Sequence, residues 1–141
     1  MSEEVDSEQA HAREKADWEA VRDLEIRLQR GQPLELTSEV SELLRRTAGQ
    51  VAISSEDAEK GLRSASEAVA LLTEIRRRIH EGSERLAEVM MVSVSRAARG
   101  DIRGARKVLN SALAAEAVPY HRKVYEALLG SLDKLKQSAR S

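Results

Sequence analysis

The chain of 141 residues contains no cysteine, which excludes disulfide bonds, thiolate metal ligands and cysteine nucleophiles. It has only seven glycines and two prolines, and aromatic residues make up 2% of it. It also lacks any alternating β-branched run long enough for a strand. Alanine, leucine, glutamate and arginine are abundant and favour helix almost throughout. These features predict an all-α protein, and the lack of cysteine fits a reducing compartment.

Long hydrophobic runs are absent as well. Residues 1–17 are acidic and polar without the apolar segment of a signal peptide, and no later run approaches the length of a membrane span. We therefore expect a cytoplasmic protein that has no membrane partner.

Motifs that carry catalysis are missing too. The histidines His11, His80 and His121 are scattered, and none has a second ligand at the spacing of a helical zinc site. There is no HExxH motif, no glycine-rich phosphate loop and no GxSxG nucleophile elbow. The sequence therefore predicts no catalytic residue, no metal and no cofactor, and we expect a protein that is not an enzyme.

Charge is divided unevenly along the chain, although the formal net charge is only −1. Residues 1–60 hold 8 basic and 15 acidic residues, whereas residues 61–141 hold 15 basic and 9 acidic residues. Two interpretations stay open. The halves can present complementary surfaces within one fold or between subunits, or the basic half can meet an acidic partner, either protein or nucleic acid.

The clearest helical pattern runs from Ser54 to Ala98. Its apolar side chains recur at alternating steps of four and three, which is close to a heptad seam. They are Ala58, Leu62, Ala65, Val69, Leu72, Ile79, Leu86 and Met90. Gly82 and Ser83 resemble a helix end followed by a new N-cap, and an unbroken helix of this length would exceed a compact domain. We therefore predict a break or kink near Gly82.

Capping and turn residues divide the rest of the chain. We predict a first helix from about Asp17 to Gly31, a second capped by Thr37 or Ser38, and the long element capped by Ser54. Asp101 is placed to cap the next helix, and Pro119 suits the first turn of the last one. The result is a compact bundle of about five helices. It forms a single domain over residues 17–136, between a frayed acidic lead-in (1–16) and a polar tail (137–141).

Two apolar groups have alternative interpretations. Trp18, the only tryptophan, is either a core anchor of the first helix or an exposed interface anchor.

Met90 and Met91 lie among valines, so that the helix is apolar on more than one face. Such a helix is either central in the bundle or covered by a partner, and we favour the central position.

The candidate partner-binding residues surround the turn at Gly100 and Asp101. A guanidinium offers a fork of donors that suits carboxylate or phosphate. This cluster is either a solvated turn or a docking site for acidic groups, on another protein or on the chain's own acidic half. Two tyrosines near Pro119 are further candidates for partner binding. The alternative is that they pack at the edge of the hydrophobic core. The set is Arg96, Arg99, Arg103, Arg106, Lys107, Tyr120 and Tyr125.

The stretch from Leu86 to Leu135 resembles a degenerate tetratricopeptide-type helical hairpin. The residues behind this resemblance are Gly100, Asp101, Ala105, Leu109, Ala112 and Pro119. Ser93 and Arg96 depart from the pattern, because they stand where a small glycine and an aromatic residue are usual. The resemblance implies that the last helices stack like a repeat, and a single such unit needs the other helices as neighbours.

Over nearly its full length the chain also resembles the DUSAM family, a bacterial group of small proteins of unknown function. The matching segments are residues 18–25, 31–37, 53–54 with Ala58 and Glu59, 74–79, 81–83 with 86–88, and 100–101 with 104–106. The resemblance implies a bacterial cytoplasmic protein and carries no catalytic residue over to this chain.

Taken together, these patterns predict a non-enzymatic protein–protein interaction module, such as an adaptor, regulator or inhibitor. We expect it to present a helical face and the arginine cluster to an acidic protein partner, and self-association stays open. The alternative is a nucleic-acid-associated regulator that uses the basic C-terminal half. The scarcity of aromatic residues for base stacking disfavours this alternative.

Overall fold

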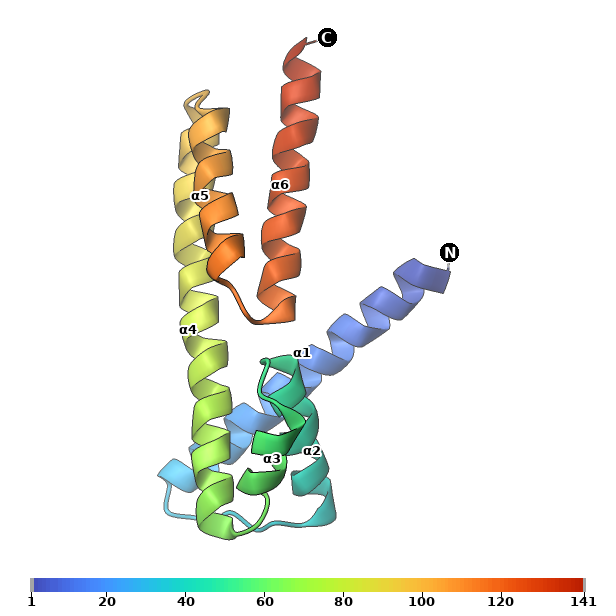
Figure 1. Ribbon diagram of the computed structural model, residues 1–141, viewed down its shortest axis with the longest axis vertical. Coiled ribbons are helices and arrows are strands. Elements are labelled where there is room, and N and C mark those ends of the chain that lie inside the picture. Colours follow the sequence, from blue (N-terminus) through green and yellow to red (C-terminus); the bar gives the residue numbers. More distant parts are fainter. Residues whose placement is uncertain (1, 141) are drawn as a thin grey trace. The chain divides into compact units, whose positions relative to one another are not determined.

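The computed structural model describes the backbone of residues 2–140 and the side chains of residues 9–135 and of Gln137. This part of the chain contains six helices and no strand (Figure 1). The helices are α1 (Ser2–Gln29), α2 (Ser38–Gln50), α3 (Ser55–Gly61), α4 (Ala65–Ala98), α5 (Ile102–Ala115) and α6 (Pro119–Arg140). The all-helical class is therefore confirmed, and the predicted count of about five helices is one too low.

The contacts divide the chain into two compact units, Met1–Ile79 and His80–Ser141, which we call the first and the second unit. The sequence predicts a single domain over residues 17–136. The long helix α4 contributes its residues 65–79 to the first unit and its residues 80–98 to the second. Each unit has its own buried apolar side chains, which is why local packing separates them.

The ends of the chain are more helical than the sequence predicts. α1 begins at Ser2, within the predicted frayed lead-in, and α6 continues to Arg140, within the predicted polar tail. Among residues 9–16 every side chain except that of Glu14 is exposed. This stretch of α1 therefore buries almost nothing, as its polar composition predicts.

In the first unit, α1, α2, α3 and the start of α4 enclose an aliphatic core. Thr37 caps α2 and Ser54 caps α3, each accepting a hydrogen bond from the backbone N–H three residues on, as the sequence predicts. Gly31 follows α1 with a φ of 89°, a conformation that glycine adopts without strain. The buried apolar side chains are Val21, Leu34, Leu44, Ala48, Val51, Ala58, Ala68, Leu71, Leu72, Ile75 and Ile79.

The long helical pattern is interrupted at Gly61, well before the predicted break. α3 ends there, and the hydroxyl of Ser64 accepts a hydrogen bond from the N–H of Glu67 (3.2 Å) in the first turn of α4. Gly61 is buried, and a Cβ at this position would lie 2.8 Å from Cβ of Leu71. The break therefore lets the backbone of α3 pack directly against a leucine of α4.

Gly82, by contrast, lies within a continuous helix, so the predicted break at this residue is wrong. α4 runs unbroken through it from Ala65 to Ala98. The glycine is buried against the imidazole of His121, and a Cβ there would lie 2.5 Å from Nδ1. Its role is therefore close packing against α6, which sequence reasoning mistook for a helix end.

In the second unit, the C-terminal half of α4 packs with α5 and α6 (Figure 1). The buried centre comes from α5 and α6 and consists of Ala105, Leu109, Ala112, Tyr125 and Leu132. Leu86, Val89 and Ala97 of α4 pack against it. Arg122 of α6 donates from Nη1 to the carbonyls of Leu113 (2.8 Å) and Glu116 (2.9 Å), which satisfies acceptors at the C-terminal end of α5.

The methionine-rich segment of α4 is not central in the bundle, which corrects the favoured prediction. Met91 and Val94 are 73% and 56% exposed, and Met90 and Val92 are also exposed. The inward-facing residues of this segment are Leu86, Val89, Ser93 and Ala97. The apolar residues at 91 and 94 therefore lie on the outer face of α4.

Arginines of α4 connect the helix to the rest of the first unit. Glu74 accepts hydrogen bonds from Arg77 (2.6 and 2.9 Å) and from Arg78 (2.8 Å). These bonds lower the pKa of Glu74 from 4.5 to about 2. Arg78 also donates to the backbone carbonyls of Val51 (3.0 Å) and Ala52 (3.2 Å), in the turn that joins α2 to α3. Glu74 therefore orients an arginine that ties α4 to this turn.

The substitution Glu74→Gln is expected to lower the free energy of unfolding by about 0.5–1 kcal/mol at pH 7. The effect is small because the Glu74 side chain is 36% exposed, and solvent weakens ion pairs at the surface. The folded-state pKa of Glu74 lies below its unfolded value, so its contribution is complete above pH 4.5 and is lost as the pH falls toward 2. Urea denaturation at pH 7 and near pH 2 measures the free energy of unfolding of wild type and of Glu74→Gln. The two values should differ at pH 7 and become nearly equal near pH 2. Glu67→Gln on the same helix is the control, and its effect should not depend on pH in this way.

Candidate interaction surface at the α4–α5 turn

The turn between α4 and α5 brings the predicted basic residues to one end of the second unit. Gly100 adopts a φ of 86°, and the N–H of Asp101 donates back to the carbonyl of Arg96 (2.9 Å). The carboxylate of Asp101 then accepts from the N–H of Gly104 (2.9 Å), which makes it the N-cap of α5, as predicted. The reversal places the last turn of α4 beside the first turn of α5.

Two of the five basic side chains are engaged within the fold. Arg106 forms an ion pair with Asp133 of α6. Arg96 is half-buried and donates from Nη1 to the carbonyl of Gly104 (3.4 Å) across the turn. Both arginines therefore stabilise the arrangement of α4, α5 and α6. Part of their hydrogen-bonding capacity is used within the fold, so fewer donors remain for a partner.

The other three, Arg99, Arg103 and Lys107, are exposed and have no ion pair with any side chain that the structure describes. Beside Arg103 lies an open hollow of about 600 Å³, lined by residues 100–103 and Arg106. Exposed guanidinium groups retain all their donors for a carboxylate or phosphate. The structure thus reduces the predicted cluster of five cations to three available ones.

The two candidate tyrosines lie elsewhere in the second unit. Tyr120 is half-buried, and its ring meets that of His121 edge-on, with centroids 5.7 Å apart. Tyr125 is fully buried between α5 and α6. Tyr125 therefore cannot contact a partner in this fold, which corrects its place among the candidates. It belongs to the core, the alternative role that the sequence also left open.

Tyr125 belongs to a buried polar cluster that sequence reasoning missed. Glu116, with 3% of its side chain exposed, lies with Oε1 3.5 Å from Nδ1 of His121, which is fully buried. Oε1 also accepts from the N–H of Val118 (3.1 Å), while Oε2 meets Arg85 of α4 (3.4 Å). Burial raises the pKa of Tyr125, the negative charge of Glu116 raises it further, and Arg85 opposes both.

The contacts of this polar cluster join α4, the loop before α6 and α6 itself. Glu116 accepts the hydrogen bond of the Val118 N–H in the loop before α6, and Arg85 of α4 forms an ion pair with the same carboxylate. No spacing rule connects positions 85, 116, 121 and 125.

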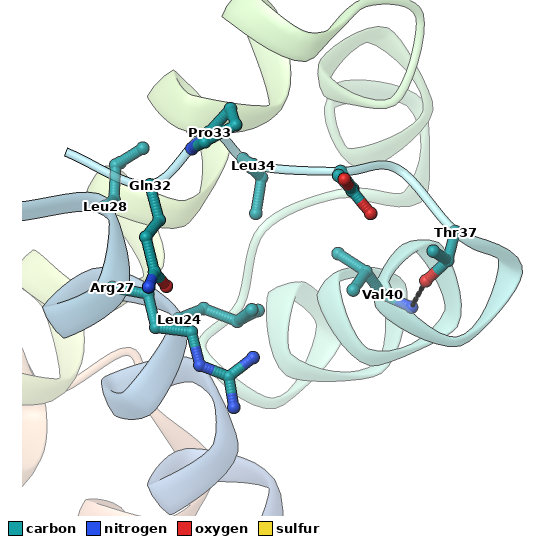
Figure 2. Close-up of a pocket in the computed structure, with 9 residues that line it drawn as sticks. Leu24, Arg27, Leu28, Gln32, Pro33, Leu34, Thr37 and Val40 are labelled. Carbon is teal, nitrogen blue, oxygen red and sulfur yellow. Dashed lines mark hydrogen bonds between the residues drawn. The ribbon is translucent and has the colours of Figure 1, made fainter. Parts of the chain in front are cut away.

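The first unit carries an open apolar hollow where α1 turns toward α2. It is lined chiefly by Leu24, Leu28, Leu34 and Val40, with Arg27 at its edge, and measures about 470 Å³ (Figure 2). It lacks any group of titratable side chains that could perform chemistry.

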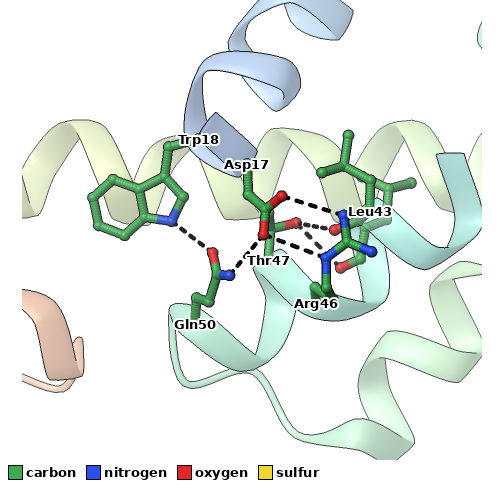
Figure 3. Close-up of polar contacts among 7 residues, drawn as sticks. Asp17, Trp18, Leu43, Arg46, Thr47 and Gln50 are labelled. Carbon is green, nitrogen blue, oxygen red and sulfur yellow. Dashed lines mark hydrogen bonds and ion pairs between the residues drawn. The ribbon is translucent and has the colours of Figure 1, made fainter. Parts of the chain in front are cut away.

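A polar network joins α1 to α2 on another face of the first unit (Figure 3). The indole Nε1 of Trp18 donates to Oε1 of Gln50 (2.9 Å), whose amide donates to Asp17 (2.9 Å). Asp17 also accepts from Arg46 through two nitrogens (3.2 and 3.3 Å). Trp18 is half-buried, so it anchors α1 while part of its ring stays accessible.

The described side chains contain no group of three histidine, aspartate or glutamate residues that could hold a metal ion. Within the described residues, no helix is both long and apolar enough to cross a membrane.

Comparison with known proteins gives one match. No curated protein and no solved structure matches the chain. Residues 16–134, well over half of the chain, match a family described as "Protein of unknown function (DUF2379)". The matched range includes both units' cores and the α4–α5 turn, and we conclude that the chain belongs to this DUF2379 family.

Proposed function

We propose that this protein is a non-enzymatic interaction module that binds an acidic segment of a partner protein through the cations of the α4–α5 turn. The observation that carries the proposal is the exposure of Arg99, Arg103 and Lys107 around a hydrogen-bonded turn, without ion pairs to described side chains. These three cations lie at the facing ends of α4 and α5. The N-cap Asp101 and the hydrogen bond from Arg96 to the carbonyl of Gly104 stabilise these helix ends. Because the backbone of the turn is already ordered, binding costs mainly the conformational entropy of the three exposed side chains.

Several features support a protein partner. Aromatic residues for base stacking are nearly absent, and the chain as a whole is not basic. A cytoplasmic location and the likeness to the DUSAM family remain predictions. The tetratricopeptide-like arrangement of residues 86–135 is part of the same proposal, and the buried Ala105 and the Gly100–Asp101 turn support it.

Charge reversal of Arg103 and Lys107 tests the proposal. Arg103→Glu with Lys107→Glu is expected to weaken binding of a labelled Glu/Asp-rich peptide by about tenfold or more, because attraction at two positions becomes repulsion. Fluorescence anisotropy at several salt concentrations measures this. Wild-type affinity should also fall as salt rises. The matched control, Lys123→Glu with Arg63→Glu, changes net charge equally at exposed positions that are not part of the turn.

The same variants serve in capture of the tagged protein from native lysate. An acidic protein that is recovered with wild type and the control but not with the turn variant supports the module. Retention of nucleic acid that depends on Arg103 and Lys107 would favour the nucleic-acid-associated regulator instead. Equal peptide binding by all three proteins would refute the role of the turn.

A further inference from the structure

The outer face of α4 in the second unit carries an apolar strip at coiled-coil spacing. Its residues are Ala87, Met91, Val94 and Ala98, which follow one another in steps of four, three and four. Met91 is 73% exposed and Val94 is 56% exposed, and both alanines are exposed as well. We call this set the α4 strip. Nothing among the described residues covers it.

This spacing is the one by which helices pair. Side chains in steps of three and four line up along one side of a helix, and the opposite side of α4 is already packed in the core through Leu86, Val89 and Ala97. An exposed methionine and valine on the free side, flanked by alanines that allow close approach, match the seam of a second helix.

Charge along the strip selects the partner and its direction. Glu84 and Glu88 lie at its N-terminal end and Arg99 lies at its C-terminal end, and all three are exposed. Two copies of α4 side by side in parallel would oppose like charges at both ends. Two antiparallel copies would instead bring Glu84 and Glu88 of each toward Arg99 of the other, and the helix dipoles favour the same direction.

We propose that the α4 strip is the interface of a homodimer in which two copies of α4 pair antiparallel, about a two-fold axis close to Met91. Such an interface is isologous, so the single pattern of acids, apolar residues and arginine complements itself. The segment from Glu84 to Arg99 is about 22 Å long. A helix pair of this length belongs to the smaller class of interfaces, so the dimer dissociates at low concentration. The inference does not depend on the proposed binding of acidic segments.

Sedimentation velocity over a concentration series is the first test. Wild type should show a reversible monomer–dimer equilibrium, and Met91→Glu should weaken it by at least about tenfold. Leu135→Glu makes the same kind of change at an exposed leucine of α6, 54% exposed, and should leave the equilibrium unchanged. Because Met91 is exposed, its substitution should keep the circular dichroism spectrum of the fold. A wild-type protein that stays monomeric at millimolar concentration would overturn the proposal.

Charge exchange tests the antiparallel direction. Glu84→Lys with Glu88→Lys makes both ends of the strip basic, and Ser95→Glu with Arg99→Glu makes both ends acidic. Each variant alone should be monomeric, and an equimolar mixture should form a heterodimer. A variant with all four changes should recover the homodimer, because it again has opposite charges at its two ends. Unchanged dimerisation in the first two variants would contradict the charge argument.

The absence of cysteine from the chain allows a direct measurement of register. Met91→Cys should cross-link to itself under mild oxidation, because this residue lies near the two-fold axis. Ser95→Cys should not cross-link to itself, since the two Ser95 positions would lie about 12 Å apart along the helices, but it should cross-link to Glu88→Cys in a mixture. Self-linking of Ser95→Cys would show parallel helices and overturn the proposal. Met91→Glu and the cysteine variants leave Arg99, Arg103 and Lys107 intact, so their effect on dimerisation is measured separately from peptide binding. Only the Arg99→Glu variants change a residue that both proposals use.

Discussion

Gly82→Ala is expected to lower the free energy of unfolding by about 2–3 kcal/mol, the upper part of the range for overpacking a buried site. Alanine in the middle of a helix normally stabilises it by about 1 kcal/mol relative to glycine. At this position the new methyl would lie 2.5 Å from Nδ1 of His121 and closer still to Cε1. The imidazole is fully buried, so it cannot move aside without disturbing Glu116 and the start of α6.

Urea denaturation followed by circular dichroism measures this effect, and Gly130→Ala on α6 is the matched control. No atom lies within 4 Å of a Cβ built at Gly130, so this substitution should stabilise the protein by about 0.5–1 kcal/mol. In a His121→Ala background the cost of Gly82→Ala should largely disappear, because the clashing ring is gone. A stabilising effect of Gly82→Ala in wild type would contradict the packing role of this glycine.

Tyr125→Ala is expected to cost about 3–5 kcal/mol, the usual loss when a buried aromatic side chain is truncated to alanine. Tyr125 is fully buried in the centre of the second unit, where it packs with Leu109 and Leu132. Tyr125→Phe keeps the ring and should be neutral or stabilising. The reason is that the Tyr125 hydroxyl is buried without a hydrogen-bond partner among the described residues, and such a group carries its desolvation cost uncompensated.

Denaturation of both variants, with Tyr120→Ala as the control for a half-buried tyrosine, tests this difference. Amide hydrogen exchange of α5 and α6 locates the effect, because local loss of packing lowers protection there first. A loss of more than about 1 kcal/mol in Tyr125→Phe would mean that the hydroxyl has a partner. The prediction of an uncompensated buried group would then be wrong.

Sequence patterns predicted the local structure of the α4–α5 hairpin well. Asp101 caps α5, Pro119 starts α6, and the turn at Gly100 has the backbone conformation that glycine favours. Each of these features depends on residues within one helical turn, so their spacing is visible in one dimension. The all-helical class follows in the same way from composition and period.

Glycine shows where such reasoning fails. Gly61 and Gly82 look alike as interruptions of a helical pattern, yet α3 ends at the first and α4 continues through the second. Both pack closely against a side chain from elsewhere in the fold, Leu71 for Gly61 and His121 for Gly82. His121 lies 39 residues away in sequence from Gly82, and no periodicity connects the two.

The candidate site was predicted only in part, for a related reason. The sequence places five basic residues near one turn, but pairing of Arg106 with Asp133 and burial of Tyr125 depend on how α6 packs. The exposure of Met91 likewise depends on which side of α4 faces the core.

The sequence by itself determined the helical class, most helix caps and the charge pattern, because these depend on propensities and neighbours a few residues apart. Only the tertiary structure decided which glycines mark breaks, which cations remain available and which apolar face of α4 is left uncovered. Those outcomes depend on contacts between helices distant in sequence, where the fit of one side chain against another determines whether a residue is buried, paired or exposed.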